Sequence, residues 1–201
     1  MKIVVYGATG MVGSEIAKTA VARGHEVTAV SRSGNDVLGA TGRAADITDT
    51  DTFLKLAASA DAVVVAIPTG RTSEPTELMV DAHRRIIAAM PAARLLVVGG
   101  AGSLTVGGGR LVDAPGFPDA YRPESTAFAA ILEDYKASSG LDWTYVSPSP
   151  VIAPGERTGY VLGTDSPIGD SVTTSDFADA ILDELETPAH KGRRFTAASK
   201  S

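Results

Sequence analysis

The chain has 201 residues, of which 44% are hydrophobic and 21% charged, a composition typical of one globular domain with a substantial core. It contains no cysteine, which excludes disulfides, thiolate metal sites and thiol nucleophiles. The formal net charge of −6 argues against an electrostatic nucleic-acid binder, because such proteins need a basic face to displace counterions from phosphates.

The apolar segment before Gly7 is shorter than the apolar core of a secretory signal. No apolar run approaches the ~20 residues that a membrane-spanning helix needs. We therefore expect a cytoplasmic protein that binds neither membrane nor nucleic acid, and that acts on a small molecule. The sequence does not indicate the oligomeric state.

Short apolar runs alternate with amphipathic stretches along the whole chain. The pattern predicts, in chain order, a strand over 2–6, a helix over 11–23, strands over 26–30 and 43–45, and a helix over 49–58 capped by Asp49 or a threonine. A strand over 61–67, a helix over 74–90 and a strand over 95–98 follow. The Gly- and Pro-rich residues 99–123 are expected to form a long loop.

The last third of the chain begins with a predicted helix over 124–139 and a strand over 143–147. Residues 151–172 are irregular, with a short hairpin as one option. A helix over 175–186, with Ser175 as its N-cap, and a strand over 194–197 complete the prediction.

Strands that alternate with helices indicate parallel strands joined by crossover helices. Continuous apolar strands fit a sheet that is covered on both faces. We therefore predict an α/β fold, a single doubly wound parallel sheet over residues 1–201 with a small C-terminal region on the substrate side. Ligands of such sheets bind beyond the carboxyl ends of the strands, near the point where the strand order reverses.

Glycines mark the turn between the first strand and the first helix. Gly7 permits a tight turn, Gly10 lets backbone approach a diphosphate, and Gly13 lets the helix pack close to the strand. The helix start adds free N–H groups and the positive end of the helix dipole. This combination predicts a Rossmann-type dinucleotide site, whereas a turn that binds nothing is the alternative. The predicted site residues of this loop are Gly7, Thr9, Gly10, Met11, Val12 and Gly13.

The Gly-x-x-Gly-x-x-Gly spacing, with Ala8 and Thr9 inside it, resembles the extended and atypical short-chain dehydrogenase/reductases. Residues 96–104 (LVVGGAGSL) and 142–148 (DWTYVSP) resemble the NAD(P)H-binding, NmrA-like family often named NADH-flavin reductases. The flavin reductase/biliverdin reductase B group is a more distant relative. The resemblance covers most of the chain and implies a compact Rossmann domain with a small substrate pocket.

The residues after the second strand bear on the choice of cofactor. NAD-preferring sites usually carry an acidic residue there to bind the ribose hydroxyls, but this chain has Ser31 and Arg32. Arg32 is suited to charge-assisted bonds with a 2′-phosphate, and Ser31 or Ser33 adds a hydroxyl. We therefore expect NADPH to be preferred over NADH. The alternative for Arg32 is an ordinary solvated surface arginine.

Further cofactor contacts are expected along the same edge of the sheet. The resemblance implies that Asp46 and the residue after it, Ile47, contact adenine, whereas a helix cap is the alternative for Asp46. Small residues after the fourth and fifth strands let backbone come close to the ribose and the nicotinamide. The proline-rich loop after the sixth strand is expected near the nicotinamide, or is simply a rigid turn. The residues predicted in these three loops are Ala66, Ile67, Pro68, Gly99, Gly100, Pro148 and Ser149.

The proton donor of ketone-reducing relatives is a tyrosine with a lysine four residues further on. No tyrosine of this chain has that partner: the residues four positions after each one are Gly10, Ser125, Ser139, Ser149 and Thr164. Flavin reduction does not need such an acid, because the protein only holds two rings face to face. The leading hypothesis is an NADPH-dependent reductase of a flavin or similar planar acceptor. A non-catalytic dinucleotide sensor is the alternative, and a sugar-nucleotide epimerase is disfavoured.

Ser103 stands where the resemblance implies a catalytic-edge serine, although a turn-capping role is the alternative. The substrate rim is expected from residues 69–71 and the loop 104–122, with Phe117 and Tyr121 able to stack on a planar ring. The histidines have no metal-ligand spacing, so we predict no metal, and His83 is expected to be a surface or helix-packing residue.

Overall fold

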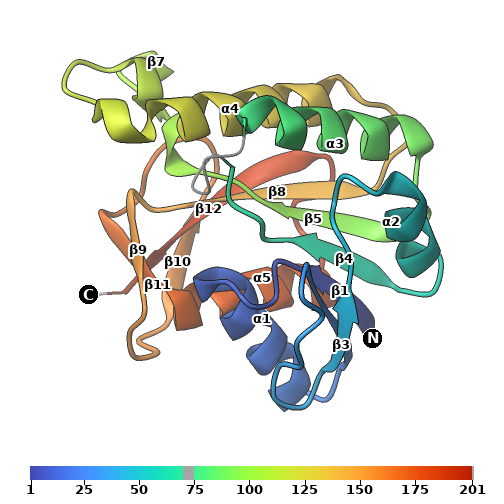
Figure 1. The fold of residues 1–201 in the computed structure, drawn as a ribbon. Helices are drawn as coiled ribbons and strands as arrows, with labels where there is room; N and C mark the ends of the chain where they lie inside the picture. Colours follow the sequence, from blue (N-terminus) through green and yellow to red (C-terminus); the bar gives the residue numbers. More distant parts are fainter. Residues whose placement is uncertain (70–74, 201) are drawn as a thin grey trace.

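A computed structural model describes residues 1–69 and 75–200. It contains a central eight-stranded sheet with helices on both faces (Figure 1). The strands are β1 (Lys2–Tyr6), β2 (Glu26–Ser31), β3 (Thr41–Ala44), β4 (Ala62–Val65), β5 (Arg94–Val98), β6 (Thr105–Val106), β7 (Gly109–Arg110), β8 (Trp143–Pro148), β9 (Val151–Ala153), β10 (Tyr160–Gly163), β11 (Ser171–Thr173) and β12 (Arg193–Ser199). The helices are α1 (Met11–Ala22), α2 (Thr50–Ala57), α3 (Thr76–Ala89), α4 (Arg122–Ala137) and α5 (Thr174–Glu186), with short 3-10 helices η1 (Ala101–Ser103), η2 (Leu111–Asp113) and η3 (Asp119–Tyr121).

The sheet has the strand order β10-β12-β8-β5-β4-β1-β2-β3. All neighbouring pairs are parallel except β10, which runs antiparallel to β12 at one edge. The chain moves from β1 toward β3 in one direction and from β4 toward β12 in the other, so the order reverses between β1 and β4. This confirms the predicted doubly wound parallel sheet and fixes its crevice at the carboxyl ends of β1 and β4.

Each face of the sheet is buried by its own group of helices, because successive side chains of a strand point to opposite faces. Val5 and Val64 face one way and join a core with residues of α1 and α5. Val4 and Val63 face the other way and join a core with residues of α2, α3 and α4. Figure 1 shows the two layers, with α3 and α4 on one side of the sheet and α1 and α5 on the other.

Away from the crevice, ion pairs tie α5 to α1 and to the sheet. Arg23, at the end of α1, contacts Asp179, Asp183 and Glu186 of α5 at 2.9, 2.6 and 3.1 Å. Arg94, at the amino end of β5, forms a buried pair with Glu184 of α5 at 2.6 Å. A buried pair of this kind fixes the relative position of two elements, since either charge alone would be strongly unfavourable there.

Two segments are more ordered than the sequence predicts. The expected loop over 99–123 contains the short β6–β7 hairpin and the three 3-10 helices. The expected hairpin within 151–172 is wrong for the described residues: β9 pairs in parallel with β11, and β10 pairs with β12 instead. The pairings of β9 and β10 depend on strands distant in the sequence, which a local pattern does not contain.

The helix caps were predicted with mixed success. Asp49 caps α2 and accepts a hydrogen bond from the amide of Thr52 at 3.1 Å, as expected. Ser175 is not the cap of α5, because the helix begins one residue earlier and Thr173 accepts from the amide of Asp176 at 3.0 Å. The predicted start of the third helix, Glu74, lies outside the described residues. None of the helices in the described part of the chain combines the length and apolar character that crossing a bilayer requires.

His83 lies between α3 and α4 and is only 1% exposed, so it is a helix-packing residue. Its Nδ1 shares a hydrogen bond of 3.1 Å with the hydroxyl of Tyr135, and the two rings meet edge to face. Burial lowers the pKa of His83 from 6.5 to about 4, because the surrounding apolar side chains disfavour the charged imidazolium.

This buried imidazole predicts a pH dependence of stability. Between the pKa values of 6.5 and about 4, His83 takes up a proton in the unfolded chain but not in the folded chain. The stability that depends on the neutral imidazole is therefore fully present above about pH 6.5 and decreases as the pH falls toward 4. On going from about pH 7.5 to about pH 5, the protein should lose about 2 kcal/mol of unfolding free energy more than the variant His83→Gln. Urea unfolding at both pH values measures this difference. An equal loss in both proteins would contradict the assignment.

Candidate functional site

The turn after β1 brings three segments of backbone into close contact. Gly7 has a φ of +79°, and a Cβ on it would lie 2.4 Å from the carbonyl oxygen of Ala66. A Cβ on Gly13 would lie 2.2 Å from the carbonyl oxygen of Gly7. Neither position therefore admits a side chain without moving β4 or α1. The roles predicted for these two glycines, a tight turn and close helix–strand packing, match the geometry.

Gly10 differs from the other two glycines because it is exposed. A Cβ there would meet only the carbonyl oxygen of Gly7, at 3.3 Å, and would otherwise point into open space. Gly10 is also the N-cap of α1, and the first intrahelical bond runs from the amide of Ser14 to its carbonyl at 2.9 Å. The amides of residues 11–13 precede that bond and, with the helix dipole, suit an anionic group such as a diphosphate.

The ends of β2 and β3 are joined to this turn by backbone hydrogen bonds. The carbonyl of Val30 accepts from the amides of Gly7 and Ala8 at 3.0 and 3.1 Å, and the carbonyl of Ser31 accepts from Ala45 at 3.0 Å. Arg32, which follows β2, is exposed. The residues predicted to select the 2′-phosphate therefore lie next to the glycine turn, on its β2 side.

Three side chains in this region are already engaged within the fold. The hydroxyl of Ser31 accepts from the amide of Gly34 at 3.0 Å and shapes the turn that carries Arg32. Asp46 accepts from the amide and hydroxyl of Thr48 at 2.8 and 2.6 Å, so it braces its own turn and does not cap α2. Ile47 is 3% exposed and packs in the core, which leaves only its backbone for a contact with adenine.

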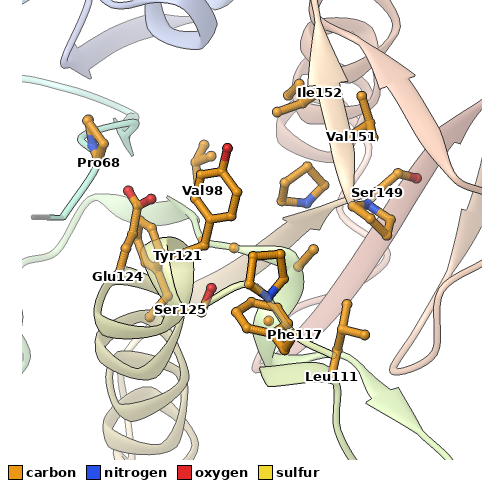
Figure 2. A pocket seen from close by; sticks show the side chains of 18 of the residues that line it. Pro68, Val98, Leu111, Phe117, Tyr121, Glu124, Ser125, Ser149, Val151 and Ile152 are labelled. Atoms are coloured by element: carbon orange, nitrogen blue, oxygen red, sulfur yellow. The ribbon is translucent and has the colours of Figure 1, made fainter. Parts of the chain in front are cut away.

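On the other side of the glycine turn lies a cavity of about 720 Å³. It opens at the carboxyl ends of β4, β5 and β8, and α4 forms one wall (Figure 2). The predicted cofactor residues that line it are Gly10, Met11, Val12, Ala66, Ile67, Pro68, Gly99, Gly100, Pro148 and Ser149. Gly7, Thr9, Gly13, Ser31, Arg32, Asp46 and Ile47 do not line it and lie along the turn and the β2–β3 edge. The fold thus brings two groups of predicted residues to adjoining parts of one crevice.

The glycines after β5 line the cavity and are also packed against aromatic side chains. A Cβ on Gly99 would lie 2.0 Å from the hydroxyl of Tyr145, and one on Gly100 would lie 3.1 Å from Phe128. Aromatic rings of β8 and α4 therefore stand directly behind these two glycines. The buried Tyr145 hydroxyl donates to the carbonyl of Phe128 at 2.9 Å, and burial raises the pKa of Tyr145. Tyr145 therefore keeps its proton and serves as a packing residue.

The structure does not bring Ser103, the predicted catalytic residue, to the lining of this cavity. Its hydroxyl donates to the carbonyl of Gly100 at 3.2 Å and accepts from the guanidinium of Arg194 at 3.0 Å. Arg194 is buried and also binds Asp165 at 2.6 Å. Ser103 therefore braces the loop after β5 from behind. Ser149 lines the cavity, but its hydroxyl donates to the carbonyl of Ala197 at 2.9 Å inside the fold.

The predicted substrate rim is present in part. Phe117 and Tyr121, from the loop before α4, line the cavity as expected, and Tyr121 is 59% exposed (Figure 2). Thr69 is described and buried, whereas Gly70 and Arg71 lie outside the described residues. The C-terminal region contributes Val151 and Ile152 of β9 as a further wall, which agrees with a substrate-side role for that region.

The sequence analysis missed the part of the cavity formed by α4. Glu124, Ser125 and Phe128 line it from the first two turns of that helix. Spacing gave a partial signal, because Ser125 is one of the residues that follow a tyrosine by four positions. Within residues 1–69 and 75–200, no group of three or more histidine or carboxylate side chains is arranged to hold a metal ion.

Comparison with known proteins identifies the family of this chain. Residues 7–188 match the model of the NAD(P)H-binding family. The chain belongs to the NAD(P)H-binding family. Across the full length of both proteins it is 41% identical to the uncharacterized protein YwnB of Bacillus subtilis.

Solved structures of this family share the whole fold. SP1627 of Streptococcus pneumoniae, named a "putative NADH-flavin reductase", is 31% identical in sequence to this chain. Its crystal structure superimposes with a TM-score of 0.91, and the match covers 100% of both chains. A protein of Bacteroides thetaiotaomicron named a "putative epimerase" is 33% identical, with a TM-score of 0.89, and the match covers 100% of this chain and 97% of the other. The chain is thus an NAD(P)H-binding Rossmann protein of the atypical short-chain dehydrogenase/reductase type.

The different surroundings of Gly10 and Gly13 predict different effects of the same substitution. Gly10→Ala adds a methyl group that points into the crevice, so the fold should lose no more than about 1 kcal/mol while the Kd for NADPH rises about tenfold or more. Gly13→Ala forces α1 away from the glycine turn and should cost about 2 kcal/mol or more of stability. Thermal unfolding and calorimetric titration measure both effects. A folded Gly10→Ala protein with unchanged NADPH affinity would remove the glycine turn from the binding site.

Proposed function

We propose that this chain is an NAD(P)H-dependent oxidoreductase, with NADPH preferred, that reduces a flavin or similar planar acceptor. The observation that carries the proposal is the continuity of the glycine turn with a large apolar cavity. Met11 and Val12 belong to both, so a dinucleotide held at the start of α1 would project its nicotinamide into that cavity. The naming of the Streptococcus pneumoniae relative agrees with this activity.

The chemistry follows from the lining of the cavity. A dinucleotide held at Met11 and Val12 would supply a hydride from its nicotinamide, and water would supply the proton that completes reduction of the acceptor. The walls, which include Phe117, Tyr121 and Phe128, offer flat apolar surfaces that orient two rings and exclude water. No lysine or histidine is among the described residues that line the cavity, so the arrangement suits an acceptor that needs no enzyme-bound proton donor.

The size of the cavity favours an enzyme over a non-catalytic sensor. A sensor needs to bury only the dinucleotide. The volume of the cavity, about 720 Å³, lies within the range of sites that bind small molecules. Several walls of the cavity, including η2, the loop before α4 and β9, are not among the predicted dinucleotide contacts. These walls support the binding of an acceptor in addition to the dinucleotide.

A direct assay tests the proposal. Purified protein is mixed with NADPH and a neutral quinone, a flavin or a redox dye, and absorbance is followed at the nicotinamide band. We expect turnover well above the rate without protein, and lower turnover in Gly10→Ala at limiting NADPH. Saturable NADPH binding without turnover of any acceptor would favour the sensor. Absence of saturable binding of NADPH and NADH would overturn both functions.

The preference for NADPH depends on Arg32. It is exposed at the carboxyl end of β2, beside the glycine turn, and the described part of that turn contains no acidic side chain that would favour the ribose hydroxyls of NADH. Arg32→Asp should therefore invert the ratio of the Kd values for NADPH and NADH. Arg85→Asp makes the same charge change on α3 and should leave the ratio unchanged. An unchanged ratio in the Arg32 variant would refute this part of the proposal.

A further inference from the structure

We propose that the side-chain hydroxyl of Ser125 donates a hydrogen bond to a carbonyl oxygen of the acceptor. The cavity thereby favours planar acceptors that carry a carbonyl group on the ring, such as quinones and isoalloxazines, over planar acceptors that carry none. The inference rests on the proposed function and narrows the substrate class of the same cavity.

Few side chains of the cavity can donate a hydrogen bond. Among the described residues that line it, only Tyr121, Ser125 and Ser149 carry a side-chain hydroxyl, and none carries a side-chain N–H group. The hydroxyl of Ser149 already donates to the carbonyl of Ala197. Tyr121 is exposed at the rim, whereas Ser125 is partly buried in the wall that α4 forms. Ser125 is therefore the donor that an acceptor meets inside the cavity.

The fold makes no use of the Ser125 hydroxyl. A serine inside a helix commonly donates to the carbonyl four residues earlier, which here is the carbonyl of Tyr121. The Ser125 hydroxyl forms neither this bond nor any other within the described part of the chain, and its oxygen is not sealed inside the fold. Figure 2 shows Ser125 on the α4 wall with its oxygen directed into the cavity. A few polar groups of this kind orient ligands in otherwise apolar sites.

A close approach of η1 fixes the position of this side chain. A Cβ on Gly102 would lie 2.5 Å from the Cβ atom and 2.7 Å from the Oγ atom of Ser125, so only glycine allows η1 and α4 to meet here. The next residue of η1, Ser103, is bound by the buried guanidinium of Arg194 at 2.7 and 3.0 Å. The hydroxyl of Ser125 is thus held beside the loop that is predicted to contact the nicotinamide.

Hydride transfer strengthens a hydrogen bond at this place. The hydride that reaches the ring carries two electrons and one proton and leaves NADP⁺ behind, and the reduced ring takes a second proton from water. In quinones and isoalloxazines, part of the negative charge develops on a ring carbonyl oxygen. A donor already directed at that oxygen stabilises the transition state more than the ground state. Ser125 keeps its own proton throughout.

The position on α4 favours the acceptor over the dinucleotide as the partner of Ser125. The predicted dinucleotide contacts come from the glycine turn with the start of α1 and from the segments after β2, β3, β4, β5 and β8, and none comes from α4. Tyr121 and Phe128, which offer flat apolar surfaces to an acceptor ring, flank Ser125 along α4 and line the same cavity. A carbonyl at the edge of such a ring would meet the hydroxyl.

Ser125→Ala removes the hydroxyl alone. The variant keeps the Cβ atom against Gly102 and loses no hydrogen bond of the described fold, so Tm should stay nearly unchanged. Thr126→Ala is the matched control, because Thr126 carries a hydroxyl on the same helical turn but is exposed and does not line the cavity.

Turnover is compared for 1,4-naphthoquinone, which has ring carbonyls, and methylene blue, which has none, at saturating NADPH. In Ser125→Ala, kcat/KM for the quinone should fall about tenfold relative to kcat/KM for the dye. Thr126→Ala should leave this ratio unchanged. The chain has no cysteine, so the quinone cannot attach to a thiol of the protein.

Binding provides a readout that does not depend on turnover. Calorimetric titration in the presence of NADP⁺ gives Kd values for 1,4-naphthoquinone and for naphthalene, which has the same ring system without the carbonyl oxygens. In Ser125→Ala the Kd of the quinone should rise severalfold, whereas the Kd of naphthalene should not change. The Kd of NADPH should also stay the same.

The outcomes separate the two proposals. If both acceptors are reduced and their ratio is equal in wild type and Ser125→Ala, the carbonyl recognition is wrong and the reductase stands. If Ser125→Ala weakens NADPH binding without changing the ratio, the hydroxyl serves the dinucleotide and the inference is wrong. An equal shift of the ratio in Thr126→Ala would remove the assignment to Ser125. If NADPH binds but no acceptor is reduced, the proposed function fails, and equal changes in the Kd values of naphthalene and the quinone would then overturn the carbonyl recognition as well.

Discussion

The contact of three backbone segments at the crevice is the constraint on which the rest of the structure depends. The carbonyl of Ala66, at the end of β4, and the carbonyl of Gly7, at the end of β1, each occupy the space that a side chain would need. Only glycine at positions 7 and 13 lets β1, β4 and α1 converge in this way. This convergence directs the start of α1 into the crevice and sets the distance between the glycine turn and the apolar cavity.

The far side of the cavity is built by a different principle. Its backbone is held from behind by side chains that do not line the cavity: Tyr145 behind Gly99, and Arg194 with Ser103 behind the loop after β5. Packing and buried hydrogen bonds of this kind rigidify a surface that is itself almost without polar groups. Packing shapes the cavity in this way in a chain whose sequence has no tyrosine followed four residues later by a lysine.

Much of this organisation is predictable from the sequence because it is local. The apolar runs specify the central strands, and the glycine spacing specifies the turn that follows β1. The position of Ser103 was not predictable, because the direction of its hydroxyl depends on Arg194, far along the chain. Glu124 was missed for a similar reason: nothing in the local pattern indicates which face of a helix start meets a cavity. The small strands β9 and β10 acquire their partners only in the folded protein.

The order of strands at one edge has a consequence for how the chain assembles. In the sheet β12 is inserted between β8 and β10, although β10 precedes it in the sequence. During synthesis, β10 thus emerges before β12, the strand with which it pairs in the described part of the chain, and it can pair only after α5 and β12 have been completed. Until then Val161 and Leu162 lack their neighbour, so a chain arrested in this interval would present an unpaired apolar edge to chaperones or to other nascent chains.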